Sequence, residues 1–174
     1  VRAPSVTAMT LTPTGLRFMG RTFPCSIGKG GVRSDKREGD GATPTGTHRV
    51  VGMFYRPDRI SAPQPWAMPI GITDLWSDAS GEAHYNQHVK LPYGHSHEVL
   101  RRADPLYDLV LVTDYNWPEA QDRKGSAIFL HAWRRPGFPT EGCIAFRADH
   151  LLWIARGVSL GTKIIVPEGL ARQP

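Results

Sequence analysis

Two almost continuous apolar segments of strand length constrain the fold most. "LYDLVLVTDYN" runs from Leu106 to Asn116, and "SAIFLHAW" runs from Ser126 to Trp133. Segments of this length with little polar alternation are typical of strands that are covered on both faces. Shorter strand-like segments, separated by turn residues, lie at Ser5–Thr12, Thr22–Ile27, Thr47–Tyr55 and Gly161–Gly169. The pattern predicts a mostly β fold of the sandwich type.

Composition supports one loop-rich domain over residues 1–174. The 18 glycines and 15 prolines are numerous for a helical protein, and a chain of this length is sufficient for one sizeable core. A helix is predicted at Ala148–Val158, where Leu151 and Ile154 follow helical spacing and Asp149 lies in the first turn. We expect one or two short helices in all.

The formal net charge of +5 favours an anionic partner or a solvated basic surface. Basic residues occur in scattered pairs such as Arg101-Arg102, without a long basic run, so we expect no nucleic-acid module. No run of 18 apolar residues is present, and we expect no membrane span. The residues after Val1 lack the apolar core of a secretory signal, which leaves the compartment open.

A candidate nucleophile follows the second apolar segment. Cys143 lies twelve residues after His131, between a strand end and the predicted helix. Thiol catalysis needs a base, a group that orients the base, and N–H donors for an oxyanion, and Gly142 permits a turn that presents such donors. By spacing alone, a buried cysteine beside a structural histidine is the better interpretation. Cys25 lies in a strand-like segment, and we expect it to be a small buried hydrophobic side chain.

Two ordered segments, "KREGDGATPTGTHRV" and "GSAIFLHAWRRPGFPTEGCIAF", add specificity. Together they resemble the L,D-transpeptidases of the YkuD family, in particular its short bacterial branch with a T-E-G-C segment. The resemblance covers about Arg21 to Val166, and it implies a β-sandwich with one or two short helices and a cysteine-bearing loop. The matching positions are Lys36, Gly39, Asp40, Thr43, Pro44, Gly46, His131, Thr140, Gly142 and Cys143.

The resemblance implies a reaction on peptidoglycan stem peptides. Cys143 would attack the carbonyl of the diamino acid at the third position of a stem tetrapeptide, expel the terminal D-Ala and hold the stem as a thioester. An amine from another stem, a D-amino acid or water would resolve the thioester, so an L,D-carboxypeptidase or endopeptidase is the alternative. The family implies no metal or organic cofactor, a location in the periplasm or cell wall, and acylation of Cys143 by carbapenems.

The resemblance also implies roles for individual residues. His131 would be the base, the backbone carbonyl of Ala132 would orient it, and the N–H groups of Gly142 and Cys143 would bind the oxyanion. Thr140 would shape the loop. Trp133 and Phe138 would form a wall for the stem peptide or a hydrophobic contact within the loop. The candidate substrate-binding residues are Trp133, Arg134, Thr140, Glu141, Arg147 and His97.

The chain departs from the family pattern at two positions beside the nucleophile. Glu141 stands where many members have a second histidine, and Ala145 stands where they have Arg or Asn. A carboxylate next to the thiol is expected to raise the thiol pKa unless Arg134, Arg135 or Arg147 neutralises it. The alternative is that Glu141 pairs outward in a surface ion pair.

Four of the seven histidines are close together in the sequence, at His84, His88, His95 and His97. Zinc binding by this cluster is a remote alternative function, because histidine pairs are common zinc ligands. The segment contains Pro92 and Gly94, however, and it lacks an H-E-x-x-H motif. We therefore expect no metal site. We expect either that His97 or Glu98 lines the substrate cleft, or that both are polar loop residues.

Overall fold

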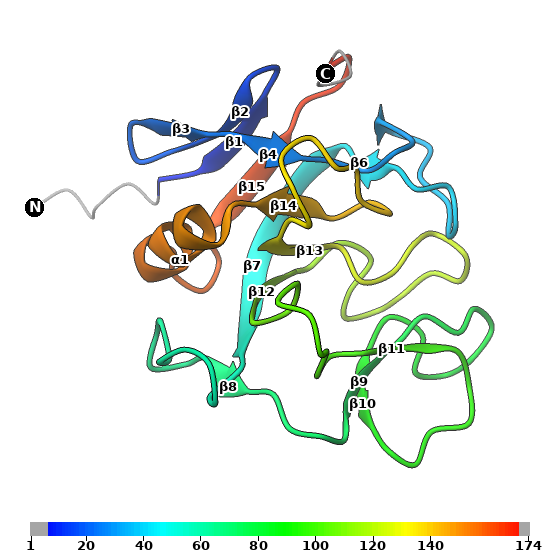
Figure 1. The fold of residues 1–174 in the computed structure, drawn as a ribbon. Helices are drawn as coiled ribbons and strands as arrows, with labels where there is room; N and C mark the ends of the chain where they lie inside the picture. The colour runs from blue at the N-terminus through cyan, green and yellow to red at the C-terminus, as the bar shows by residue number, and fades with distance from the viewer. Residues whose placement is uncertain (1–6, 171–174) are drawn as a thin grey trace, which may run out of the picture.

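The computed structural model describes residues 7–170, which form a mostly β fold with one helix, α1 (Ala148–Gly157) (Figure 1). The prediction of a mostly β fold with a short helix is confirmed. No helix in this range has the length and hydrophobicity that a membrane span requires. The strands are β1 (Met9–Thr12), β2 (Gly15–Phe18), β3 (Arg21–Phe23), β4 (Cys25–Ser26), β5 (Val32–Arg33), β6 (Thr43–Pro44), β7 (Gly46–Tyr55), β8 (Met68–Pro69), β9 (Asp74–Ser77), β10 (His88–Lys90), β11 (His97–Val99), β12 (Leu109–Thr113), β13 (Phe129–Ala132), β14 (Ile144–Phe146) and β15 (Lys163–Val166).

One ten-stranded sheet dominates the molecule, in the order β3-β2-β1-β15-β7-β12-β13-β14-β4, with β8 paired to β7. Only Pro24 separates β3 from β4 in the chain, so the two ends of the sheet are adjacent and the sheet is nearly closed, like a barrel (Figure 1). The sequence predicted one strand over Thr22–Ile27. That prediction is wrong at Pro24, because proline has no N–H group to donate within a ladder.

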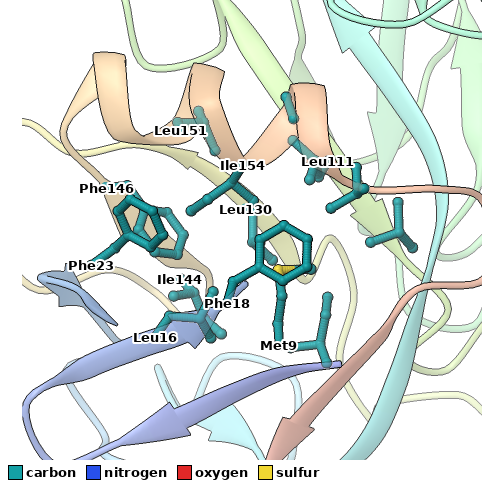
Figure 2. Packing of buried hydrophobic residues seen from close by; sticks show 14 of the residues in the cluster. Met9, Leu16, Phe18, Phe23, Leu111, Leu130, Ile144, Phe146, Leu151 and Ile154 are labelled. Atoms are coloured by element: carbon teal, nitrogen blue, oxygen red, sulfur yellow. The ribbon is translucent and has the colours of Figure 1, made fainter. Parts of the chain in front are cut away.

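The two central strands are covered on both faces, as their apolar sequences predict. Successive side chains of a strand point to opposite faces. Leu109 and Leu111 of β12 belong to a core that includes residues of α1 and of the β1–β2 hairpin (Figure 2). Val110 and Val112 belong to a second core on the other face. In β13, Leu130 joins the first core and Phe129 joins the second.

Helix α1 packs its apolar side against the first core through Leu151, Ile154 and Ala155, close to the predicted boundaries. Trp153 is half-buried beside this core, and its ring lies 5.2 Å from the ring of Phe23. The helix therefore covers the face of the sheet that does not carry the candidate site.

A small three-stranded sheet, β10-β9-β11, lies on the side of the second core (Figure 1). Trp76 of β9 meets Phe129 of β13 edge to face at 5.0 Å between ring centroids. These three strands are only three or four residues long, and their sequence pattern did not predict them. They matter for function because β11 carries Glu98.

Candidate active site

Cys143 precedes β14 and lies beside Phe129 of β13. The two strands are parallel, with Leu130 opposite Ile144, so the preceding pair is Phe129 and Cys143. The thiol is buried and accepts a hydrogen bond from the Phe129 N–H at 3.4 Å. The Cys143 S–H donates to the carbonyl oxygen of Ala127 at 3.1 Å. In the resting protein the thiol is thus held by main-chain groups on both sides.

His131 lies on β13 two residues after Phe129, so its side chain points to the same face of the sheet as Phe129 and Cys143. Its Nδ1 atom is 2.7 Å from the carbonyl oxygen of Ala132. Because a carbonyl only accepts, Nδ1 carries the proton. The neutral ring therefore has Nε2 available as a proton acceptor, which is the tautomer that a general base requires.

A cavity of about 470 Å³ brings most of the predicted residues together. Its lining also contains residues that the sequence analysis did not select, among them Tyr107 and Arg102. The volume is within the range of pockets that hold small ligands. The predicted residues that line it are His131, Trp133, Arg134, Thr140, Glu141 and Cys143, together with Glu98 and Phe138.

Burial keeps both members of the Cys–His pair neutral near pH 7. It lowers the pKa of His131 to about 4, although the hydrogen bond to Ala132 opposes that shift. Burial and, to a smaller extent, the negative charge of Glu98 raise the pKa of Cys143 to about 12. The free protein thus holds a thiol and an imidazole, and not a thiolate–imidazolium pair.

These pKa shifts predict how Cys143 reacts with iodoacetamide as the pH changes. Only the thiolate reacts, and its fraction rises about tenfold per pH unit below the thiol pKa. We expect the rate constant at Cys143 to increase continuously from pH 6 to pH 10, measured by peptide mass spectrometry. A rate that is already constant from pH 5 to pH 8 would instead indicate a preformed ion pair with His131.

The backbone just before Cys143 is held by Thr43 of β6. Thr43 Oγ1 donates to the carbonyl oxygen of Gly142 at 2.8 Å and accepts from the Gly28 N–H at 2.9 Å. Gly142 has φ +140°, and a Cβ atom there would lie 2.7 Å from the carbonyl oxygen of Ala42. Only glycine fits this position without a shift of backbone atoms. The Thr-Pro element and the cysteine loop therefore form one structural unit.

The Gly142 N–H does not point freely into the site, contrary to the role expected for it. It donates to Thr140 Oγ1 at 3.1 Å, and the Thr140 hydroxyl in turn donates to the carbonyl oxygen of Cys143 at 2.6 Å. The expectation that Thr140 shapes the loop agrees with these contacts. Of the two expected oxyanion donors, only the Cys143 N–H remains for that role in this arrangement.

Glu141 points outward. Its carboxylate forms an ion pair with Lys29 at 2.8 Å, and 76% of its side chain is exposed. The partner is none of the three arginines considered from the sequence. The carboxylate whose charge acts on the Cys143 thiol is that of Glu98.

Two predicted substrate-binding residues lie outside this cavity. Arg147 is the residue before α1, and its guanidinium donates to Asp149. The Arg147 side chain lines a different cavity, together with Trp153. His97 Nδ1 lies 2.7 Å from the carbonyl oxygen of His95. Glu98, in contrast, lines the cavity that contains Cys143.

Tyr107 contacts both His131 and Glu98, and the sequence did not indicate it as a site residue. Its ring meets the His131 ring edge to face at 5.4 Å, and its hydroxyl donates to Glu98 Oε2 at 2.7 Å. The Arg102 guanidinium lies over the Tyr107 ring, 5.4 Å from the ring centroid. Tyr107 begins an apolar run, which gave no signal of a polar role.

The histidines of the 84–97 segment have separate partners. His88 Nε2 is 2.8 Å from Asp74, and His95 Nε2 is 3.4 Å from Glu82. Within residues 7–170, no three His, Cys, Asp or Glu side chains are grouped so that they could hold a metal ion.

The chain is similar to a known protein family and to solved structures. The family model described as YkuD, L,D-transpeptidase catalytic domain, matches residues 8–166. A structure of an L,D-transpeptidase from Mycobacterium smegmatis aligns with a TM-score of 0.43 and 15% sequence identity. That alignment covers 92% of this chain and 58% of the mycobacterial one, so this chain spans little more than half of that protein's length. No curated protein has a significantly similar sequence.

Proposed function

The chain belongs to the YkuD family of L,D-transpeptidase catalytic domains, and we propose that it transfers peptidoglycan stem peptides through a thioester on Cys143. The observation that carries this proposal is the buried pair formed by Cys143 and His131. Both side chains line one cavity, and the hydrogen bond from His131 to Ala132 leaves Nε2 as the proton acceptor. A positioned base beside a thiol is the arrangement that nucleophilic catalysis requires.

In the proposed first step, the thiol proton leaves its hydrogen bond to Ala127 and moves to His131 Nε2. As the proton moves, the sulfur forms a bond to the carbonyl carbon of the third residue of the stem. The Cys143 N–H stabilises the oxyanion. The C–N bond to the terminal D-Ala breaks, and the leaving amine takes the proton from His131. Because burial disfavours the free thiolate, proton transfer and attack are expected to occur together.

In the proposed second step, a neutral amine attacks the thioester carbonyl and gives a proton to His131 Nε2. The new C–N bond forms, the C–S bond breaks, and His131 returns the proton to the Cys143 sulfur. With water as the attacking group the same intermediate gives a tripeptide, which is the carboxypeptidase outcome. Peptidoglycan lies outside the cytoplasm, so the proposed reaction takes place in the periplasm or cell wall.

Mass spectrometry of purified tetrapeptide muropeptides, with and without a D-amino acid, tests the proposed function. Dimers or exchange of the terminal D-Ala would support a transpeptidase, and tripeptide alone would support a hydrolase. A substrate that stays intact under all conditions would contradict both. EDTA should leave the products unchanged, because no step of the proposed reaction uses a metal.

A further inference from the structure

Glu98 brings a carboxylate into the cavity beside the nucleophile. It lies on β11 opposite Trp76 of β9, so the two side chains share one face of the small sheet. Trp76 contacts Phe129, which is the neighbour of Cys143 on β13. Glu98 therefore faces the main sheet, and its side chain lines the cavity together with Cys143.

Among residues 7–170, no cationic side chain forms an ion pair with this carboxylate, and the only cation that acts on its pKa is the neighbouring Arg102. Its hydrogen bond comes from the neutral hydroxyl of Tyr107, whose pKa burial raises well above the usual value. Arg102 also lines the cavity, but its Nε and Nη2 atoms donate to Asp104 at 2.9 and 2.6 Å. Burial raises the pKa of Glu98, and the hydrogen bond from Tyr107 and the charge of Arg102 oppose that shift only in part.

We propose that Glu98 and Tyr107 form a binding subsite for a primary ammonium group of the substrate, next to Cys143. This inference rests on the proposed function, because stem peptides supply such groups. A diamino acid in the donor carries a side-chain ammonium. An acceptor carries an amine that would bind here as the ammonium and would lose a proton before it attacks the thioester. An ammonium ion matches the site because it donates to the Glu98 oxygens and balances a charge that is otherwise unpaired.

The subsite also affects the nucleophile. Without a ligand, the charge of Glu98 raises the pKa of the Cys143 thiol. A cation bound to Glu98 cancels much of that charge, so the thiol loses its proton more easily in the complex than in the free protein. Binding of the correct substrate is then coupled to activation of the sulfur.

Charged thiol reagents test the subsite without any substrate. The cationic 2-aminoethyl methanethiosulfonate and the anionic 2-sulfonatoethyl reagent differ mainly in charge. Glu98→Gln removes the negative charge but keeps an oxygen that accepts from Tyr107. We expect this change to lower the ratio of the two rate constants at Cys143, cationic reagent over anionic reagent, roughly fivefold or more, because one nearby charge is lost. A change in the thiol pKa affects both rate constants equally, so it does not change their ratio. Peptide mapping measures the reaction of Cys25 separately.

Glu38→Gln is the matched control. Glu38 accepts a hydrogen bond from the Tyr85 hydroxyl at 2.9 Å, much as Glu98 does from Tyr107, and it does not line the cavity. The rate ratio of Glu38→Gln should equal that of the wild type. The rate ratio of Glu98→Asp should also be close to the wild-type value, because aspartate keeps the negative charge. An unchanged ratio in Glu98→Gln would overturn the subsite.

Substrate variants distinguish donor from acceptor. If the donor supplies the ammonium, Glu98→Gln lowers kcat/KM for D-Ala release roughly 10- to 100-fold, and acetylation of the donor side-chain amine removes the difference between the proteins. If the acceptor supplies it, D-Ala release is unchanged and only transfer to amines falls. Equal values in all assays would overturn the inference and leave the proposed function intact. Failure of the wild type to release D-Ala, with the reagent ratio still sensitive to Glu98, would contradict the proposed function alone.

Discussion

Replacing Cys143 by alanine is expected to reduce release of terminal D-Ala from tetrapeptide stems by about ten-thousand-fold or more. The proposed reaction passes through a covalent bond to this sulfur, and no other group in the cavity can replace it. The thiol is buried in the second core and makes weak hydrogen bonds only, so alanine should leave the fold intact. Initial rates by liquid chromatography, with circular dichroism as a folding check, measure both effects.

Cys25→Ala is the control for this prediction, because Cys25 lies on β4 and packs partly buried against the first core. Its activity should remain close to that of the wild type. If Cys143→Ala kept more than about one hundredth of the wild-type rate, covalent catalysis by this residue would be wrong.

Asp40→Asn is expected to have the largest effect on stability, about 3–5 kcal/mol in the free energy of unfolding. Asp40 forms an ion pair with Lys36 at 2.6 Å, in which the side chains are 15% and 4% exposed. Asparagine would leave the Lys36 ammonium buried without an anion. The same carboxylate accepts from the N–H groups of Arg37 and Ala42, so the loop that holds Gly142 would also loosen. Urea denaturation at pH 7 measures the change.

Asp35→Asn is the matched control, because Asp35 pairs with Arg33 in the same loop but both side chains are largely exposed. This change should affect the free energy of unfolding very little. Equal destabilisation by the two variants would contradict the assignment of stability to the buried pair.

The pH dependence of stability provides a second check on Asp40. Burial alone would raise its pKa, but the hydrogen bonds from Lys36, Ala42 and Arg37 lower it overall. A carboxyl whose pKa is lower in the folded state stabilises the fold above the unfolded-state pKa of 3.8. That contribution should disappear as the pH falls below about 4, and Asp40→Asn should lack this part of the acid transition.

The central strands and the helix could be predicted because their signals are local. Leu109 to Val112 alternate between two buried faces, so every residue of this run is apolar. The helical spacing of Leu151 and Ile154 likewise depends on one segment only. Pro24 shows the limit of this reasoning, because a single residue without an N–H group divided a segment that otherwise reads as one strand.

The site could be predicted only where its residues share a continuous motif. Cys143, His131 and Ala132 all lie in the one segment from Gly125 to Phe146, so the sequence alone suggests them together. Glu98 and Tyr107 come from other segments, and their contact depends on how the small sheet packs on β12 and β13. The outward direction of Glu141 depends on Lys29, 112 residues away, which local sequence cannot reveal.

Mass spectrometry of the intact protein, quenched in acid shortly after mixing with a stem tetrapeptide, tests the central claim most directly. We predict a species heavier than the free protein by the mass of the stem without its D-Ala, with the added mass on the peptide that contains Cys143 and absent from Cys143→Ala. Turnover of the substrate with no adduct, or with the adduct on another residue, would contradict a thioester at Cys143.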